Sequence, residues 1–312
     1  MPFVKLLAQR EPEASIEYIV GSGHLQELLE NTVPYINKVW LAGKKSLAQD
    51  LQRVRAAGKV DEFIFLHSAW WKSWWLNLRF IGASKVVGYK RDDSLSAVAN
   101  YASSYFPELR DQLIEDAHQV LESKVLDTLS LRAERSNPEK YICIVPGVGH
   151  LRPHRAYPLK KWMDLIEQIL NESDYQIKIL GGPDEIELSK LIEQCIINLD
   201  QSRIENLIGK TSLLELARLV KAAEHLYSAD TGILHIAAAA GCPTTSIFSI
   251  TSPRRFAPFD SGARVIQAEP CLCNPASSNR PKACEHLDGD YASCMKATHS
   301  LTFTTFQDNI VV

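Results

Sequence analysis

The segment HLYSADTGILHIAAAAGCP (225–243) holds the residue types best suited to binding a diphosphate. An apolar run ends in the turn Asp230-Thr231-Gly232, and a helix rich in small residues follows. A helix N-terminus attracts anions through its free N–H groups and its dipole, and Gly232 lets a ligand approach them closely. The Thr231 hydroxyl and His235, one turn into the helix, can donate hydrogen bonds. The pattern predicts a diphosphate cradle; the alternative is an N-cap by Asp230 or Thr231 beside a surface histidine.

A second candidate is the loop PGVGHLRPHRAYPLKKW (146–162), which follows a strand-like run in the same half of the chain. Gly147 and Gly149 permit an unusual backbone there. Ligands of open parallel sheets bind beyond the carboxyl ends of strands, where this loop would lie. The loop therefore predicts an anion site, and the alternative is a solvated basic loop. Its positive or ionisable side chains are Arg152, His154, Arg155, Lys160 and Lys161.

The turn GGPDE (181–185) is a third strand-to-helix connection. Its Glu185 carboxylate can accept hydrogen bonds from the hydroxyls of a ribose. The alternative is an acidic residue that only complements the dipole of the following helix. This turn supports the first two but identifies no ligand by itself.

Four of the seven cysteines crowd into the loop-like segment near the end of the sequence. Four thiolates can hold zinc or iron in a closed tetrahedral structural site. The leading C-x-C is tighter than the usual C-x2-C, and cytosolic disulfides are rare. The two interpretations are a structural metal site and reduced, partly buried thiols. The four residues are Cys271, Cys273, Cys284 and Cys294.

Charge and hydropathy exclude several classes of protein. The 34 basic and 37 acidic residues give a net charge of −3, without the basic excess expected of a nucleic-acid partner. No run approaches the roughly 20 apolar residues that a membrane-spanning helix needs, and the first residues meet charge too early for a signal peptide. We expect a cytoplasmic protein whose contact with a membrane, if any, is peripheral.

Strand-like and helix-like segments alternate along the chain, which predicts an α/β fold with mostly parallel sheets. A helical stretch at 111–131 and a polar stretch at 133–140 place a linker between two Rossmann-like domains, 1–135 and 136–312. The segment after about residue 268 is expected to be loop-like. The predicted strands are 15–20, 38–42, 62–67, 85–89, 141–146, 176–182, 225–230 and 244–249.

The three turns and their flanking segments together resemble glycosyltransferase family nine, the ADP-heptose–lipopolysaccharide heptosyltransferases. The resemblance rests on YICIVPGVGHLRPHRAYPLKKWMDLIEQIL, KILGGPDEIELSKLIE, the segment from NLIGK to TTSIF, and TSPRRFAP, in the family's order and approximate spacing. Asp-Thr-Gly-x-x-His is its most specific motif. The N-terminal half is similar more loosely, through EFIFLHSAWWKSWWLNLRFIGASKVVGYKR.

The resemblance implies a GT-B architecture, with two Rossmann-like domains facing across a cleft and the donor bound in the C-terminal one. It implies inverting, metal-independent transfer of a heptose or similar sugar from an ADP-sugar to a saccharide or lipid-linked saccharide, without a catalytic cofactor. Arg155 takes the place of the family's usual lysine and would neutralise phosphate charge. Glu185 would bind ribose, and Leu207 would lie near adenine. Asp230, Thr231, Gly232 and His235 would hold the diphosphate and sugar.

The chain departs from the family at the general base, an aspartate in a Gly-Asp turn after the first strand. Residues 1–7 already look like the helix that follows this turn. Three explanations stay open: a shortened chain, a non-catalytic nucleotide-sugar-binding relative, or another carboxylate as base. Glu62, Asp92 and Asp93 are candidates, and none is singled out. A sugar epimerase of similar architecture is a further alternative.

The run AWWKSWWLNL (69–78) is rich in tryptophan. Tryptophan faces bind sugars and the headgroup region of membranes, so this run could contact an acceptor or a membrane edge. The alternative is a helix that packs its aromatic side chains into the core.

Overall fold

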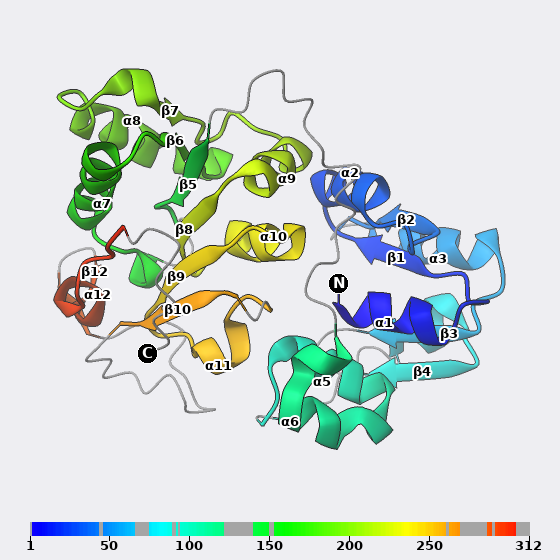
Figure 1. The fold of residues 1–312 in the computed structure, drawn as a ribbon. Coiled ribbons are helices and arrows are strands. Elements are labelled where there is room, and N and C mark those ends of the chain that lie inside the picture. The colour runs from blue at the N-terminus through cyan, green and yellow to red at the C-terminus, as the bar shows by residue number, and fades with distance from the viewer. Residues whose placement is uncertain are drawn as a thin grey trace. The chain divides into compact units, whose positions relative to one another are not determined.

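The computed structural model describes residues 2–43, 46–65, 75–88, 92, 94–121, 140–149, 153–259, 262–268, 286–288 and 291–303. The chain forms two compact units (Figure 1). The first comprises Met1–Leu131 and Arg254–Ser261, and the second comprises Arg132–Pro253 and Gly262–Val312. Neither unit is therefore one continuous stretch of sequence.

The second unit contains a six-stranded parallel sheet in the order β10-β9-β8-β5-β6-β7. The chain adds β6 and β7 outward from β5, and then adds β9 and β10 outward from β8 on the other side, as in a doubly wound Rossmann sheet. The direction switches between these two strands, and ligands of such sheets bind beyond the strand ends at the switch. The strands are β5 (Tyr141–Val145), β6 (Gln176–Ile179), β7 (Ile204–Asn206), β8 (His225–Ala229), β9 (Thr244–Phe248) and β10 (Arg264–Gln267).

Helices cover both faces of this sheet, which explains why every residue of β8 and β9 is buried. Figure 1 shows α7 and α8 on one side and α9 and α10 on the other. Apolar side chains spaced three and four apart face the sheet, as Trp162, Leu165, Ile166 and Ile169 do in α7. The main helices are α7 (Leu159–Glu172), α8 (Ile186–Cys195), α9 (Leu213–Ala222) and α10 (Gly232–Ala240); α11 (Pro253–Phe256) is a single short turn.

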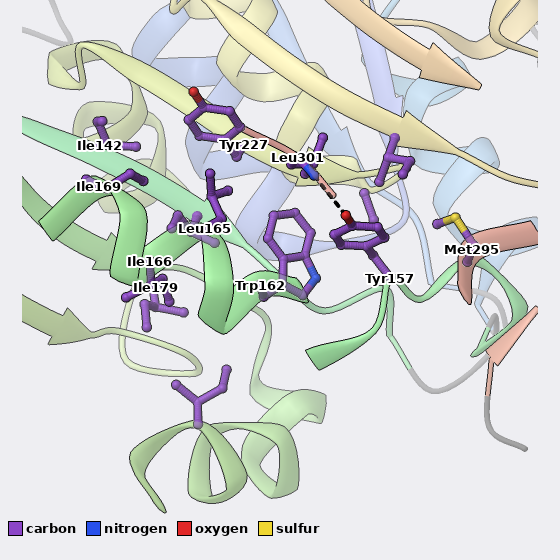
Figure 2. Close-up of a cluster of buried hydrophobic side chains, with 14 of the residues drawn as sticks. Ile142, Tyr157, Trp162, Leu165, Ile166, Ile169, Ile179, Tyr227, Met295 and Leu301 are labelled. Atoms are coloured by element: carbon purple, nitrogen blue, oxygen red, sulfur yellow. Dashed lines mark hydrogen bonds between the residues drawn. The ribbon is translucent and has the colours of Figure 1, made fainter. Parts of the chain in front are cut away.

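The core of the second unit includes residues close to the end of the sequence (Figure 2). Tyr157 and Trp162 pack edge to face with their ring centroids 5.2 Å apart. The Tyr157 hydroxyl accepts the N–H of Leu301 at 2.9 Å. Leu301 and Phe303 are both buried in the same cluster, so the segment 301–303 completes this core.

The first unit contains two pairs of parallel strands, β1 with β2 and β3 with β4. Its largest cluster of buried side chains joins α1, α5 and α6. The strands are β1 (Glu17–Val20), β2 (Lys38–Leu41), β3 (Glu62–Phe65) and β4 (Lys85–Gly88). The helices are α1 (Pro2–Arg10), α2 (Gly23–Thr32), α3 (Leu47–Ala57), α5 (Ala97–Tyr105) and α6 (Arg110–Val120).

The structure confirms the predicted alternation of parallel strands and helices and corrects three details. The helix expected at 111–131 ends at Val120 and is interrupted at Asp116, whose backbone is extended. Strands β7 and β10, of three and four residues, were not predicted. The tail is not all loop: it forms β11 (Leu287–Asp288), β12 (Tyr291–Ala292) and α12 (Ser293–Ala297). The predicted linker 133–140 lies outside the described residues except for Lys140.

Candidate functional site

Arg155 and Asp230 form an ion pair at the switch point of the sheet. Asp230 follows β8 directly, and Arg155 ends a short helix, Pro153–Arg155, in the loop after β5. Arg155 Nη1 lies 2.7 Å from Asp230 Oδ2, and the two side chains are only 14% and 5% exposed. The same nitrogen donates to the Asp230 carbonyl oxygen at 3.4 Å. The structure thus brings together two of the three segments that the sequence singled out.

A third strand end contributes to this pair. Thr251, which follows β9, donates its hydroxyl to Asp230 Oδ2 at 2.5 Å, and this contact is buried. Two residues earlier, Ser249 donates its hydroxyl to the carbonyl oxygen of His154 at 3.1 Å. Sequence analysis missed both residues. Their only signal was a cluster of hydroxyl side chains, SITS, directly after a buried strand.

The N-terminus of α10 lies beside the ion pair. Thr231 is its N-cap: the side-chain oxygen accepts the N–H of Leu234 at 3.4 Å and lies 3.1 Å from the hydroxyl of Ser228. Thr231 therefore caps α10, as one of the two interpretations expected, and its contact with a diphosphate stays a prediction. Gly232 is exposed, and a Cβ added to it would meet no atom within 4 Å. The packing of the chain therefore does not require glycine here. The predicted close approach of a diphosphate to Gly232 stays a prediction.

His235 lies one turn into α10 with its side chain exposed to solvent. Desolvation by the surrounding protein lowers the pKa of His235; Asp230 opposes the shift and Arg155 adds to it. At neutral pH a histidine with a lowered pKa is uncharged and can act as a hydrogen-bond donor or acceptor.

Glu185 joins the loops after β5 and β6. Its carboxylate accepts the N–H of Gly149 at 2.7 Å and the N–H of Gly182 at 2.9 Å. A Cβ on Gly147 would lie 2.1 Å from Glu185 Oε1, and one on Gly181 would lie 2.5 Å from Oε2. The two glycines are therefore needed so that the carboxylate can fit between the loops. The predicted contact with ribose stays a prediction.

Leu207 lies at the end of β7, beside the loop that follows β6. Its N–H donates to the Ile179 carbonyl oxygen at 2.8 Å, and its own carbonyl accepts the N–H of Lys210 at 3.0 Å. Gly209, with φ of 72°, donates to the Gly181 carbonyl oxygen at 3.1 Å. The half-buried Leu207 side chain is thus held at the same edge of the sheet as the other predicted site residues.

Other ionisable residues of the loop 146–162 have structural roles. The Lys161 ammonium donates to the backbone carbonyls of Met295, Lys296 and Thr298, so it caps α12. Desolvation lowers its pKa. His154 is buried, and Lys160 is exposed. Arg155 and the exposed Lys160 stay candidates for the predicted contact with phosphate, and Arg152 lies outside the described residues.

Comparison with known proteins shows to which family the chain belongs. A sequence profile described as Glycosyltransferase family 9 (heptosyltransferase) matches residues 46–284. The chain belongs to glycosyltransferase family 9. Among curated relatives, lipopolysaccharide heptosyltransferase 2 of Salmonella typhimurium is 28% identical over 145 residues, 46% of this chain and 40% of the relative. Lipopolysaccharide heptosyltransferase 3 of Escherichia coli is 22% identical over 276 residues, 80% of this chain and 79% of the relative.

Solved structures of family 9 members share the fold. The E. coli ADP-heptose lipopolysaccharide heptosyltransferase II matches with a TM-score of 0.64 at 20% identity, over 85% of each chain. E. coli heptosyltransferase WaaC with ADP matches with a TM-score of 0.64 at 16% identity, over 86% of this chain and 88% of that one. These matches confirm the predicted α/β fold of the GT-B type.

The cysteine prediction is tested only in part. Cys271, Cys273 and Cys284 lie outside the described residues, and Cys294 is buried in α12. Within the part of the chain that the structure describes, no group of three or more His, Cys, Asp or Glu side chains could hold a metal ion. The metal site stays a prediction.

Two of the carboxylates considered as the general base, Asp92 and Glu62, accept hydrogen bonds from other side chains of the first unit. Hydrogen bonds from Ser94, then from Arg110, lower the pKa of Asp92 to about 2. Desolvation raises the pKa of Glu62, but hydrogen bonds from Tyr105 and Lys85 outweigh it, and the net pKa is lowered. Both residues would therefore be weak bases. Asp93 lies outside the described residues.

The tryptophan-rich run is described only from Trp75 onward. Trp75 is 54% exposed and packs edge to face on Phe80, with ring centroids 5.6 Å apart. Both interpretations of the run stay predictions. None of the described helices is long and apolar enough to cross a membrane.

Proposed function

We propose that this family 9 chain transfers a heptose or similar sugar from an ADP-sugar to a saccharide acceptor of the lipopolysaccharide-core type. The observation that carries the proposal is the Arg155–Asp230 pair beside the N-terminus of α10, at the switch point of a Rossmann sheet. Heptosyltransferase relatives support it, as do solved neighbours described with ADP and with ADP-2-deoxy-2-fluoro heptose.

In this proposal the diphosphate lies over Gly232, between the Arg155 guanidinium and the N–H groups of α10. The uncharged imidazole of His235 donates a hydrogen bond to the diphosphate or the sugar. The nucleoside extends along the strand ends toward Glu185 and Leu207, whose loops lie side by side. Arginine suits this position because its fork of donors can bind a phosphate bidentately.

The reaction we propose inverts the configuration of the sugar. The acceptor oxygen bonds to the anomeric carbon, the bond from that carbon to the diphosphate breaks, and the acceptor proton passes to a general base. Arg155 and the α10 N-terminus stabilise the charge on the departing ADP, so no metal ion or cofactor is required. We assign no base among the described carboxylates.

The remaining parts of the proposal concern the acceptor. We assign it to the domain 1–135 and the donor to 136–312. We place the enzyme in the cytoplasm, where any contact with the membrane that carries a lipid-linked acceptor would be peripheral.

Calorimetric titration with ADP, ADP-heptose and UDP-glucose tests the donor site. We expect micromolar binding of both ADP ligands, weaker binding of UDP-glucose, and a loss of about tenfold or more in Arg155→Gln. Binding should survive EDTA. Arg218→Gln, on the exposed side of α9, is the matched control and should bind as wild type. Absence of nucleotide binding, or full binding by Arg155→Gln, would contradict the proposal.

A second candidate is a relative that binds the nucleotide sugar without transferring it. The ion pairs of Asp92 and Glu62 favour it, because they lower the basicity of both carboxylates. A transfer assay with a lipopolysaccharide-core acceptor separates the two candidates: donor binding without product indicates the binding protein.

A further inference from the structure

The segment directly after β9 contacts both sides of the Arg155–Asp230 pair. Thr251 donates to the Asp230 carboxylate, and Ser249 donates to the carbonyl oxygen of His154, the residue before Arg155. The backbone of Ser249 is held in turn, because the Gln267 side chain of β10 donates to its carbonyl oxygen at 2.6 Å. Two hydroxyl groups on one short segment thus hold the two halves of the pair.

Two side chains contact the same oxygen of the Asp230 carboxylate. Oδ2 receives both the guanidinium of Arg155 at 2.7 Å and the hydroxyl of Thr251 at 2.5 Å. Two charge-assisted contacts on one oxygen fix the orientation of the carboxylate. The direction of the Arg155 guanidinium therefore depends on a side chain 21 residues beyond Asp230 in the sequence.

We infer that Thr251 and Ser249 are positioning residues for donor binding, acting through Asp230 and the backbone beside Arg155. The inference rests on the proposed function, since it assumes that Arg155 contacts the diphosphate. Thr251 holds Asp230 so that Arg155 presents its N–H groups in one orientation. Binding then does not have to order a flexible guanidinium.

Calorimetry with ADP on three variants tests this inference. Thr251→Val keeps the shape of the side chain but removes the hydroxyl, and should weaken ADP binding about five- to tenfold. Thr251→Ser keeps the hydroxyl and should bind within about twofold of wild type. Ser249→Ala should weaken binding in the same direction as Thr251→Val. Thermal unfolding of each variant shows whether it is folded.

A double-mutant cycle separates positioning from a general loss of structure. In an Arg155→Gln background, Thr251→Val should cause no further loss of ADP affinity, because it acts through Arg155. An equal loss in both backgrounds, or wild-type affinity in Thr251→Val, would overturn the inference while leaving the donor site in place. If wild-type protein bound no ADP, or Arg155→Gln bound it fully, the proposed function would fail and the inference with it.

Discussion

The Glu185 carboxylate occupies the space in which a side chain on Gly147 would lie: a Cβ there would be 2.1 Å from Oε1. The two residues belong to loops that leave neighbouring strands, β5 and β6. Because the same carboxylate accepts backbone N–H groups from Gly149 and Gly182, it fixes the spacing between these loops. A ligand that lies across the ends of β5 and β6 would therefore contact two loops whose positions are fixed before it binds.

Gly147→Ala should therefore destabilise the second unit. Its methyl group can be accommodated only if Glu185 gives up its bonds to the two N–H groups, which we expect to cost about 1–3 kcal/mol. Chemical denaturation measures this loss. In a Glu185→Ala background the same substitution should cost much less. Gly21→Ala is the matched control, since its Cβ would meet its nearest neighbour at 3.8 Å; equal losses at Gly21 and Gly147 would refute the explanation.

Gly232→Ala should separate stability from binding. A Cβ at this position meets no atom of the chain within 4 Å, and alanine favours helix more than glycine does, so the melting temperature should stay the same or rise slightly. The methyl group would nevertheless occupy the approach to the α10 N–H groups, and ADP affinity should fall about tenfold or more. Gly23→Ala, equally open at the start of α2, should have the same small effect on the melting temperature and should leave ADP affinity unchanged. Retained ADP affinity in Gly232→Ala would place the diphosphate elsewhere.

Tyr157→Phe should loosen the segment 301–303 without disturbing the sheet. The substitution keeps the ring that packs on Trp162 but removes the acceptor for the Leu301 N–H. We expect a loss of about 1–2 kcal/mol. Hydrogen exchange should accelerate at Leu301 and Phe303 and stay slow at Leu165 in α7. Uniform acceleration across the unit would show that the hydroxyl supports more than this segment.

Acid should destabilise the second unit through His225. Burial lowers the pKa of His225 to about 3, with a smaller contribution from Arg264, against 6.5 for a free histidine. Below pH 6.5 the imidazole of His225 is protonated in the unfolded chain but stays neutral in the folded chain. The free energy of unfolding therefore falls by about 1.4 kcal/mol per pH unit until the pH nears 3. Denaturation between pH 7 and pH 4 measures the slope. His225→Gln can still reach the Thr245 hydroxyl, the partner of His225 at 2.9 Å, and should reduce the slope by one proton. An unchanged slope would assign the acid sensitivity to another group.

The predicted metal site is tested by elemental analysis of the purified chain. Four thiolate ligands should hold about one equivalent of zinc or iron. Cys284→Ser should lower this content, whereas Cys195→Ser, which alters an exposed free thiol in α8, should not. Metal-free protein with normal stability would favour reduced thiols.

The turn at Asp230 could be predicted because its signals are local. A buried strand, a turn containing glycine and a helix rich in small residues follow one another, and the structure places β8, the Thr231 cap and α10 as expected. Parallel pairing of the strands then brings the loop after β5 beside this turn, since parallel strands end at the same edge.

The contacts of Thr251, Glu185 and Lys161 could not be predicted in this way. Each depends on a partner from another part of the fold, such as the carbonyl groups at the end of α12 that bind the Lys161 ammonium. Sequence identifies the charge of a side chain, whereas the order of the strands decides which opposite charge or dipole it meets. From the sequence alone, a lysine that binds a phosphate cannot be distinguished from one that caps a helix, because the pairing of the strands decides which group lies beside it.

The core contributed by Leu301 and Phe303 also constrains how the protein forms during synthesis. The ribosome synthesises the central strands β5 and β8 well before Leu301 and Phe303. It reaches β10 only after it has added Arg254–Ser261, which belong to the first unit. The emerging second unit therefore leaves part of its apolar interior uncovered while the ribosome adds the last strand and the tail. We expect the nascent chain to depend on chaperones at this stage, and any fragment that stops before Gly262 to aggregate, although it contains every residue proposed to bind the donor.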